Sequence, residues 1–431
     1  MSLALYRLAG ALGDPAIRWA LERRVARGKE DASRVGERLG IATRPRPDGP
    51  LVWLHAASVG ESASVLPLIS RILAERDTGL LVTTGTRSSA SLMEARLPPG
   101  AIHQYAPIDR SPWVRRFLDH WRPDLGLWVE SELWPNLVVE SRRRGTDLAL
   151  VNGRLSARSF RRWRLAPWAV GPLLAGFDPC LVQDQEQAER LQALGAAHAR
   201  SVGNLKFSAP PLPADPVELA HLRAALAGRP VWVAASTHPG EERWVARAHR
   251  SLAAGLPGLV TIVAPRHPAR APMIRRELAS LGLRLACRSA GEDITGATDI
   301  YLADTLGELG LFYRLAPVAF VGGSLAPVGG HSPIEPAALG AVPVVGPRIE
   351  SIAGIISRLR VGGAVVEVPN AAALAPAVAR LLADDADRQR RRESARRVIA
   401  AEAGALDRVM EELAPLLECL PRHARPIHAR A

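Results

Sequence analysis

From residue 50 onward, short apolar runs alternate with segments in which apolar residues recur at helical spacing. Runs of about five apolar residues, bounded by turn signals, are typical of strands buried on both faces of a parallel sheet. The alternation therefore predicts βα units. In the first half the predicted strands are Leu51–His55, Leu80–Thr84, Ile102–Tyr105, Leu125–Val129, Leu148–Asn152 and Cys180–Gln183, and the predicted helices are Ala63–Arg76, Ser88–Arg96, Pro112–His120, Leu133–Arg144 and Gln185–Leu194.

A proline-rich segment, residues 207–216, interrupts this pattern and cannot continue a helix or a central strand, so we interpret it as a linker. A second βα series follows it. Its predicted strands are Val231–Ala235, Val260–Ala264, Asp299–Ala303, Val318–Val321, Val342–Val345 and Ala364–Val368, and its predicted helices are Glu241–Leu252, Met273–Leu281, Ile334–Leu339 and Ala372–Leu382. The sequence thus predicts an α/β fold of two tandem Rossmann-like domains with an interdomain cleft, where ligands bind at the carboxyl ends of the strands.

The amino-terminal segment has a different pattern. Leu3–Leu12 is apolar, and Ile17–Val25 mixes apolar residues with arginines. Arg7, Asp14 and Arg18 interrupt the apolar character too early for a membrane-spanning helix, and no small-residue cleavage site follows a clean apolar run. Two interpretations stay open: a helix pair lying in a membrane interface beside anionic head groups, or helices packed on the domain that follows.

Taken together, these patterns divide the chain into five parts. We expect a membrane-interfacial helical segment at 1–30, a first Rossmann-like domain at 31–206, the linker at 207–216, a second Rossmann-like domain at 217–400 and a carboxy-terminal helix and tail at 401–431.

Composition narrows the class of protein. The 431 residues are 48% hydrophobic and 23% charged, which is typical of a folded protein and not of a disordered one. The net charge of +12 favours an anionic partner such as phosphate, nucleic acid or a negatively charged membrane face. The cysteines, Cys180, Cys287 and Cys419, are too far apart for a zinc knuckle or an obvious disulfide framework, which favours a reducing compartment.

Several common site motifs are absent from the sequence. No two glycines are separated by a single residue, so the usual dinucleotide-binding fingerprint is missing, and no P-loop or H-E-x-x-H motif occurs. Asp385 and Asp387 are spaced like an acidic metal pair, but helix capping explains them better. We therefore expect no nicotinamide cofactor and no metal.

The strongest local feature follows the first predicted strand: Ser58 and Glu61 stand in a turn of small residues that leads into a helix. Their spacing is that of a capping box, and a carboxylate at a helix amino terminus is stabilised by the helix dipole. A glutamate at the carboxyl end of a parallel strand would equally face the ligand cleft, where it could accept a proton from a hydroxyl group. From the residues alone, both interpretations stand.

Two further acids, Glu130 and Glu132, follow the buried-type run Leu125–Val129. Carboxylates at this spacing repel one another unless cations or hydrogen-bond donors compensate. A plain helix start accounts for one of them and not for both, so we expect a functional role for at least one.

Lys206 closes the first domain in a chain that otherwise uses arginine almost throughout, with Lys29 as the other lysine. A compact ammonium group could be needed there against a carboxylate or a phosphate. The chance survival of one lysine is the alternative.

The second domain carries polar loops after several predicted strands. Arg266 stands between Pro265 and the His267-Pro268 pair, a rigid presentation suited to a phosphate. Gly322 and Gly323 could offer backbone N–H groups to an anion. Ser332 and Glu335 stand at the start of a predicted helix, where a phosphate and ribose hydroxyls could bind.

At this point the residues resemble a family, the 3-deoxy-D-manno-octulosonic acid (Kdo) transferases of lipid A and lipopolysaccharide biosynthesis, which are inverting glycosyltransferases of GT-B architecture. The similarity runs from about Leu51 to Pro347. It rests on the motifs Ser58-Val-Gly60-Glu61, Glu130-Ser-Glu132-Leu-Trp134-Pro135-Asn136, Asn152-Gly-Arg154-Leu-Ser156-Ala-Arg158-Ser159, Asn204-Leu-Lys206-Phe207, Pro265-Arg266-His267-Pro268, Asp304-Thr-Leu-Gly307-Glu308-Leu309 and Phe320-Val-Gly-Gly-Ser324 with Gly329-Gly-His331.

The resemblance implies transfer of Kdo from CMP-Kdo to a hydroxyl of the lipid A precursor, lipid IVA, at the cytoplasmic side of the inner membrane, without a metal or other cofactor. It implies that Glu61 is the general base and that Glu130 and Lys206 assist the transition state. The implied CMP contacts are Pro265, Arg266, Leu306, Gly307, Glu308, Ser332, Pro333, Ile334 and Glu335.

One position departs from the family pattern: Ser332 stands where the family usually has Asn, which puts that contact with the nucleotide in question. We further expect peripheral attachment to the anionic membrane surface through Leu3, Leu5, Leu8, Leu12 and Trp19. The last apolar pattern, Val409 to Leu420, is expected to return to the first domain.

Two rival functions follow from the same sequence. Another GT-B transferase or a sugar-nucleotide epimerase would share the two domains and the phosphate site but use a different donor. A nucleic-acid-binding protein would explain the +12 charge, but aromatic content is only 5% and no recognition motif occurs, so we expect no nucleic acid partner.

Overall fold

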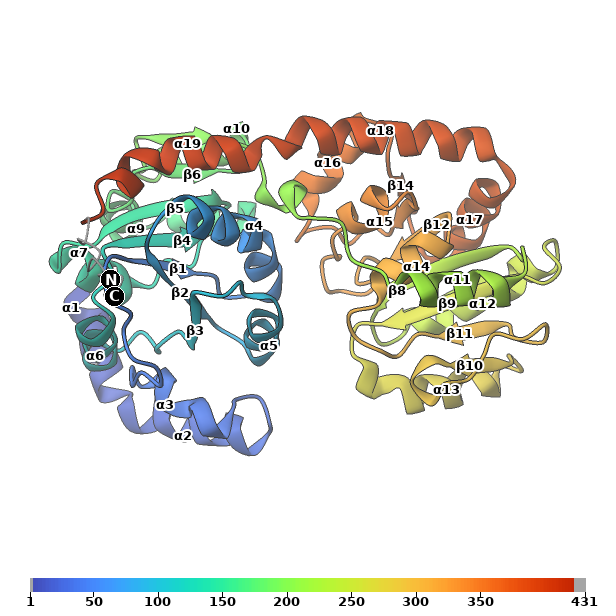
Figure 1. Cartoon of the computed structure of the whole chain (residues 1–431), viewed down its shortest axis with the longest axis horizontal. Helices are drawn as coiled ribbons and strands as arrows, with labels where there is room; N and C mark the ends of the chain where they lie inside the picture. The colour runs from blue at the N-terminus through green and yellow to red at the C-terminus, as the bar shows by residue number, and fades with distance from the viewer. Residues whose placement is uncertain (1–2, 422–431) are drawn as a thin grey trace, which may run out of the picture. The chain divides into compact units, whose positions relative to one another are not determined.

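The structure is a computed structural model that describes residues 3–421, with the side chain of Leu3 left out. Unit 1 comprises Met1–Ala209 and Glu402–Ala431, and unit 2 comprises Pro210–Ala401 (Figure 1). The chain therefore passes from one unit to the other twice. Residues 422–431 of the expected carboxy-terminal tail lie outside the described residues.

Unit 1 contains a seven-stranded parallel sheet in the order β3-β2-β1-β4-β5-β6-β7 within the described residues. Six strands confirm the predicted ones to within one residue at each end. The seventh, β7, was not predicted because it has only three residues and two of them are exposed. The strands are β1 (Leu51–His55), β2 (Gly79–Thr84), β3 (Ala101–Tyr105), β4 (Leu125–Val129), β5 (Asp147–Gly153), β6 (Cys180–Val182) and β7 (Ala199–Ser201).

Helices connect these strands. The helix α4 begins four residues before the predicted start at Ala63, because the Ser58 hydroxyl accepts a hydrogen bond from the Glu61 N–H and caps it. The helices α8 and α9 were missed, since α8 buries none of its side chains and α9 contains two prolines. The connecting helices are α4 (Val59–Glu75), α5 (Arg87–Arg96), α6 (Ser111–Trp121), α7 (Pro135–Arg143), α8 (Ala157–Trp163), α9 (Pro167–Leu174), α10 (Gln185–Gln192) and the short η2 (Leu205–Ser208).

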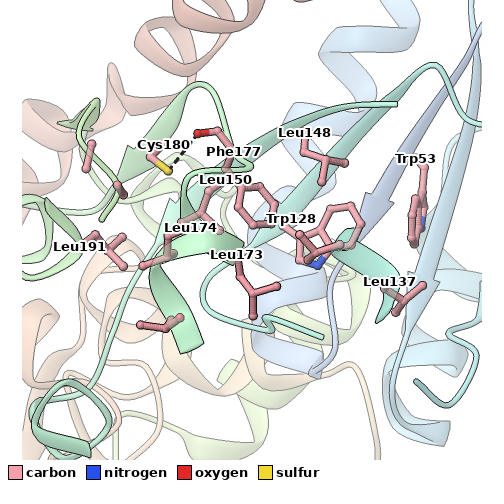
Figure 2. Close-up of a cluster of buried hydrophobic side chains, with 14 of the residues drawn as sticks. Trp53, Trp128, Leu137, Leu148, Leu150, Leu173, Leu174, Phe177, Cys180 and Leu191 are labelled. Carbon is pink, nitrogen blue, oxygen red and sulfur yellow. Dashed lines mark hydrogen bonds between the residues drawn. The ribbon is translucent and has the colours of Figure 1, made fainter. Parts of the chain in front are cut away.

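The sheet of unit 1 is buried on both faces, as near-continuous apolar strands require. Along β1, Trp53 joins a cluster with α6 and α7, while Val52 and Leu54 join a second cluster on the opposite face with α4. Figure 2 shows the first cluster, in which Trp53 and Trp128 lie among leucines of the neighbouring elements. The two indole rings meet edge to face with centroids 4.6 Å apart.

The last helix, α19 (Ala405–Glu418), belongs to unit 1, which confirms that the carboxy-terminal apolar pattern returns to the first domain. Val409 and Leu413 are buried in the same cluster as α4. Arg408 donates a hydrogen bond to the carbonyl of Val202, next to the strand β7.

The amino terminus forms α1 (Leu3–Leu12) and α2 (Asp14–Ala26), followed by the short η1 (Ala32–Arg34) and α3 (Val35–Arg38). The interpretation that these helices pack on the domain is confirmed, and the membrane-interface interpretation stays a prediction. The polar side chains of α1 attach it to the unit: Tyr6 donates to buried Asp109 at 2.9 Å, and Arg7 binds Asn136 and Glu140 of α7. The apolar side chains of Leu5, Leu8 and Leu12 are more than half exposed instead.

Unit 2 repeats the architecture with a parallel sheet in the order β10-β11-β9-β8-β12-β13-β14. The six predicted strands are confirmed to within two residues at each end, and the three-residue strand β10 was missed. The strands are β8 (Val231–Thr237), β9 (Val260–Pro265), β10 (Leu285–Cys287), β11 (Ile300–Leu302), β12 (Val318–Val321), β13 (Val342–Val345) and β14 (Val366–Glu367).

The helices of unit 2 cover both faces of its sheet. The predicted linker is shorter than its prolines suggested: Phe207 belongs to η2, and Pro216 begins α11, because proline fits the first position of a helix. The helices are α11 (Pro216–Leu226), α12 (Glu241–Ala253), η3 (Pro268–Arg270), α13 (Ala271–Ser280), η4 (Arg288–Ala290), α14 (Leu309–Leu315), α15 (Ile334–Ala338), α16 (Ala353–Val361), η5 (Ala371–Ala373), α17 (Leu374–Ala383) and α18 (Asp385–Ala403).

The packing of Trp53 gives a stability prediction. Its side chain is fully buried, and its Nε1–H donates to Thr83 at 2.9 Å, so Trp53→Ala should lower the free energy of unfolding of unit 1 by about 3–5 kcal/mol. Urea unfolding followed by circular dichroism measures this. Trp19→Ala, at an exposed tryptophan, is the matched control and should change the value by less than about 0.5 kcal/mol. Equal losses in the two variants would contradict the assignment of Trp53 to the core.

Candidate active site

The strand order of unit 1 reverses between β1 and β4. After β1 the chain adds β2 and β3 on one side, and it then crosses over to add β4 on the other. Loops that leave such a switch point diverge and open a crevice at the carboxyl ends of the strands, which is the usual ligand site of open parallel sheets. Glu61 follows β1 and Glu130 follows β4, so the topology places both at this point.

Glu61 is the third residue of α4 and is 8% exposed. Its carboxylate accepts one hydrogen bond at each oxygen, from the Ala57 N–H at 2.9 Å and from the Ser58 hydroxyl at 2.7 Å. Burial raises the pKa of this carboxyl to about 7, and the charge of Glu130 adds to the effect. A carboxylate with a pKa near neutrality and with lone pairs left free is suited to accept a proton.

Glu130 forms an ion pair with Lys206, with 2.7 Å between Nζ and Oε1. Both side chains are largely buried, which strengthens the attraction relative to a surface pair. Glu130 has a left-handed backbone with φ 59°, an unfavourable conformation for a non-glycine residue. Backbone strain of this kind gathers at functional sites, where the surrounding structure holds it in place.

Lys206 is positioned by amide side chains that sequence analysis did not single out as chemistry. The Asn204 side chain caps η2, and the Leu205 N–H donates to the Asn152 side chain at 3.1 Å. Gln183 links these two asparagines through its own hydrogen bonds. Asn152 also has a positive φ, of 55°, and the Asn-Gly pair that it begins was the available signal for a left-handed conformation.

Glu132 supplies a third acid near the same crevice. Its side chain accepts a hydrogen bond from the Trp134 indole at 3.0 Å, and burial raises the pKa of its carboxyl above its usual value, with a smaller contribution from Glu130. The repulsion between the Glu130 and Glu132 carboxylates was expected to need a cation or hydrogen-bond donors nearby. Lys206 balances the charge of Glu130, and the Trp134 indole N–H partly stabilises the charge of Glu132.

In unit 2 the sequence-predicted nucleotide contacts lie on loops after three strands. Pro265 ends β9, and the N–H of Arg266 donates to the carbonyl of Thr237 at the end of neighbouring β8. Leu306 and Gly307 follow β11 in an exposed turn, where Gly307 has φ 84°. All of these residues stand at the carboxyl edge of the sheet, as predicted for a ligand site.

The side chain of Glu308 is already engaged within the protein and is not available to a ligand as its place in this loop suggested. Arg288 grips its carboxylate in a bidentate pair at 2.6 and 3.1 Å, and this holds the pKa of Glu308 below its usual value. The charge of Glu308 is therefore already balanced within the protein. The nucleotide contact predicted for Glu308 would therefore involve its backbone, next to Gly307 with its positive φ.

Ser332, Pro333, Ile334 and Glu335 follow β12, and the predicted helix Ile334–Leu339 is confirmed as α15 to within one residue. The helix α15 has only five residues, too few for an appreciable dipole, because Gly340 and the next strand follow at once. The Ser332 hydroxyl accepts a long hydrogen bond from the Ile334 N–H, at 3.4 Å. Binding of an anion at this position would therefore depend on side chains and on individual backbone N–H groups, and not on a helix dipole.

The switch point of unit 2, between β8 and β12, carries a histidine pair that sequence analysis did not propose. His238 and His331 stack with 2.8 Å between their Nε2 atoms, so one ring donates and the other accepts. Burial lowers the pKa of both rings, that of His331 to about 4, and the charge of Arg266 adds to the effect. Arg266 therefore lies close to this pair.

Glu241 occupies in unit 2 the place that Glu61 has in unit 1, at the start of the helix after the first strand. Its buried carboxylate accepts N–H groups from His238, Gly323, Leu325 and Ala326 at 2.8–3.1 Å. Four donors saturate a carboxylate, so Glu241 fixes the loops after β8 and β12. Glu61, with two donors, keeps capacity for a substrate.

Within residues 3–421, no group of three or more histidine, cysteine, aspartate or glutamate side chains is arranged to hold a metal ion. Asp387, half of the acidic spacing noted in the sequence, pairs with Arg390 and Arg391 on its own helix. The residue that caps that helix is Asp384, whose side chain accepts the Asp387 N–H at 2.8 Å.

Comparison with known sequences finds similarity to one family, both in a family model and in individual proteins. A family model described as "3-Deoxy-D-manno-octulosonic-acid transferase (kdotransferase)" matches residues 33–209. The 3-deoxy-D-manno-octulosonic acid transferase of Bordetella pertussis is 37% identical over 381 residues, which cover 86% of this chain and 89% of that protein.

Solved structures show the same fold at much lower identity. A glycosyltransferase from Rickettsia africae is 10% identical with a TM-score of 0.57, over 86% of this chain and 100% of that one. A UDP-GlcNAc 2-epimerase from Neisseria meningitidis, bound to UDP-GlcNAc, is 11% identical with a TM-score of 0.55, over 85% and 100% of the two chains. These likenesses establish the GT-B type of fold, with two α/β units.

The raised pKa of Glu61 predicts how stability depends on pH. Because the folded carboxyl titrates near 7 and its ordinary value is 4.5, the folded state binds more protons between these values, and this group's contribution to stability falls as the pH rises through them. Glu61→Gln lacks the titration. The free energy of unfolding of wild type minus that of Glu61→Gln should therefore decrease from pH 5 to pH about 8, measured by urea unfolding of both proteins in the same buffers. A constant difference would show that Glu61 titrates near its ordinary value.

Proposed function

The chain belongs to the 3-deoxy-D-manno-octulosonic acid (Kdo) transferase family, and on this premise we propose that it transfers Kdo from CMP-Kdo to a hydroxyl group of the lipid A precursor, lipid IVA, in lipopolysaccharide biosynthesis. The observation that carries the proposal is the buried Glu61 with a pKa near 7, beside the Glu130–Lys206 pair at the switch point of unit 1.

In the proposed reaction, the oxygen of the acceptor hydroxyl attacks the anomeric carbon of Kdo, and its proton passes to the Glu61 carboxylate. The bond from the anomeric carbon to the phosphate oxygen breaks, and its electron pair leaves with CMP. Attack from the face opposite the leaving group inverts the anomeric configuration. Glu61 acts as general base, and the step needs no metal in this scheme.

Glu130 and Lys206 have a supporting role in this proposal. The positive charge that develops on the sugar ring is stabilised by a nearby carboxylate, and the ammonium of Lys206 can stabilise the carboxylate of Kdo or the departing phosphate. Their 2.7 Å ion pair holds both side chains in place before the substrate binds. Preorganised charges stabilise a transition state without further rearrangement.

Unit 2 supplies the nucleotide site in this proposal. Arg266, which has a partly exposed side chain at the carboxyl end of β9, is the cation best suited to the CMP phosphate. The backbone of Pro265, Leu306, Gly307 and Glu308 would contact the nucleotide, together with the segment Ser332, Pro333, Ile334 and Glu335. The His238–His331 pair lies close to Arg266 and can donate to a phosphate oxygen.

The amino-terminal helices support peripheral attachment to the cytoplasmic side of the inner membrane. No helix among the described residues has the length and apolar character needed to cross a bilayer. The helix α1 instead turns its polar residues toward the protein and leaves Leu5, Leu8 and Leu12 exposed, and Trp19 of α2 is exposed as well. Exposed apolar side chains are unfavourable in water, and burying them in the acyl region of a lipid surface would stabilise this arrangement. Neighbouring arginines would at the same time bind lipid phosphates.

A transfer assay tests the function. Purified protein with CMP-Kdo and detergent-dispersed lipid IVA should give a Kdo-bearing glycolipid, identified by mass spectrometry. Glu61→Gln should lower kcat by about a hundredfold to ten-thousandfold while CMP still binds, and wild-type kcat/KM should rise with pH through about 7 as Glu61 ionises. Glu75→Gln, on the exposed end of the same helix, is the control and should keep wild-type activity. Absence of product with wild type would favour another donor, as in an epimerase or a different GT-B transferase.

Membrane attachment has its own test. Flotation with vesicles containing anionic phospholipid should recover the wild type with the lipid, and the double variant Leu8→Asp, Leu12→Asp should lose most of this binding because charged residues do not enter the interface. Val217→Asp, at an equally exposed apolar residue of unit 2, is the matched control. Unchanged flotation of the double variant would rule out α1 as the attachment site.

A further inference from the structure

The histidine pair at the switch point of unit 2 forms one hydrogen-bonded unit. His238 follows β8, and His331 lies in the loop after β12, 93 positions further along the chain. Their Nε2 atoms are 2.8 Å apart, and their ring planes differ by 11°. Two ring nitrogens at this distance share one hydrogen, so in the neutral pair one Nε2 donates and the other accepts. The tautomers of the two rings are therefore linked.

Gly323 lets both rings lie against the loop after β12. A Cβ atom there would come within 3.2 Å of a ring carbon of His331 and within 3.4 Å of one of His238. The φ of Gly323 is 70°, a left-handed conformation that favours glycine. Its N–H and the N–H of His238 both donate to Glu241 at 2.8 Å. One carboxylate thus holds the two loops that carry the pair.

The outer nitrogen, Nδ1, of each ring is open to solvent. Among residues 3–421, neither Nδ1 atom makes a hydrogen bond, and neither is fully buried. Both residues are partly exposed. A ligand atom can therefore reach these nitrogens, whereas the two Nε2 atoms are occupied with each other.

The groups around the pair leave positive charge beside it. Arg266, Arg270 and the ring of His267 act on the pair from the segment after β9, and Glu241 is the acid that acts on it. Glu241 is saturated by N–H groups, and Arg270 is paired with Glu242 at 2.7 Å. The Arg266 side chain makes no hydrogen bond or ion pair within the described part of the chain. An anion beside the pair would therefore meet an unpaired guanidinium group.

The two rings differ in their neighbours, and this gives the hydrogen-bonded pair a direction. Burial lowers the pKa of His331 to about 4, and Arg266 is the largest charge that adds to this effect. Burial also lowers the pKa of His238, but there the charge of Glu241 opposes the effect. A proton added to the pair is therefore more stable on His238. With an anion beside Arg266, the favoured tautomer has the Nδ1–H of His331 pointing to the anion and the Nε2–H of His238 donating to His331.

We propose that the His238–His331 pair binds the nucleotide phosphate as a unit and takes up one proton when that phosphate becomes a monoester dianion. The assignment rests on the proposed function, which supplies a sugar nucleotide as donor. While the phosphate carries one charge, the neutral pair gives it one hydrogen bond from His331. When the bond to the sugar breaks, the phosphate gains a second charge, and Nδ1 of His238 takes a proton from water. The proton stays on the histidine, the phosphate keeps both charges, and release of the nucleotide requires loss of that proton.

Calorimetry measures this proton directly. CMP is titrated into the wild type at pH 7, where free CMP is mostly the dianion, in two buffers of different ionisation enthalpy, and the difference in heat gives the number of protons taken up. We expect an uptake of at least about 0.3 proton per CMP bound. Cytidine 5′-methyl phosphate, a diester that carries one charge, should bind with less than half of that uptake. Equal uptake with the two nucleotides, or none with either, would overturn the proposal.

Two variants test the pair itself. Asn keeps an amide near the position of Nδ1 but cannot be protonated, so His238→Asn and His331→Asn should each abolish the extra uptake and weaken CMP binding by about tenfold at pH 6 and by much less at pH 8. The difference falls as pH rises because the wild-type pair then loses its proton in the complex. His198→Asn, at an exposed histidine of unit 1, is the matched control and should keep wild-type uptake.

The double variant tests whether the rings act together. Because the proton is shared, it should bind CMP no more weakly than either single variant. Additive losses would show that the rings act separately and would overturn the proposal. If a variant does not fold, the comparison of CMP with the diester in the wild type decides.

The same titrations separate this proposal from the function itself. Proton-linked CMP binding without any Kdo transfer would overturn the function and keep the pair as a site for a nucleoside monophosphate. Kdo transfer with CMP binding that takes up no proton would keep the function and overturn the role of the pair. Absence of CMP binding by the wild type would overturn both.

Discussion

The chemistry of unit 1 depends on one electrostatic constraint: three acidic side chains are crowded at a single sheet edge with one ammonium group among them. Lys206 forms an ion pair with Glu130, and Glu132 accepts a hydrogen bond from the Trp134 indole. Glu61 accepts hydrogen bonds from two neutral donors, the Ala57 N–H and the Ser58 hydroxyl. Because the available cation is already paired, burial can hold the pKa of Glu61 near 7. The roles of base and stabiliser that we propose thus follow from the pairing of the Lys206 ammonium group with Glu130 and not with Glu61.

The two units share a topology, but the glutamate at the equivalent place differs in its hydrogen bonding. Each places a glutamate at the start of the helix that follows its first strand, next to the point where the strand order reverses. In unit 2 four N–H groups saturate Glu241, which makes it a structural clamp for the loops that carry the histidine pair. In unit 1 Glu61 has half as many donors. The number of hydrogen-bond donors, and not the residue type or its position in the helix, distinguishes the fixed carboxylate of Glu241 from that of Glu61, which we propose as the base.

The amino-terminal helices place apolar side chains at the surface of unit 1. Polar anchors such as Tyr6 and Arg7 attach α1 to buried acids and amides of the unit, so its leucines are left outside. The following helix, α2, contributes the exposed Trp19. In the proposed function, this exposed apolar side attaches the enzyme to the membrane surface.

The sequence alone determined the elements whose burial is complete. The central strands were predicted closely because a strand covered on both faces must be apolar throughout, and the loops after them carried the candidate residues, including Glu61, Glu130 and Lys206. Strands of three residues, β7 and β10, left too little pattern to detect. Only the tertiary structure decided that Lys206 pairs with Glu130 across 76 positions of sequence and that His238 meets His331. Such contacts depend on the register of distant strands and on left-handed turns such as that at Glu130, and no local pattern of residues encodes them.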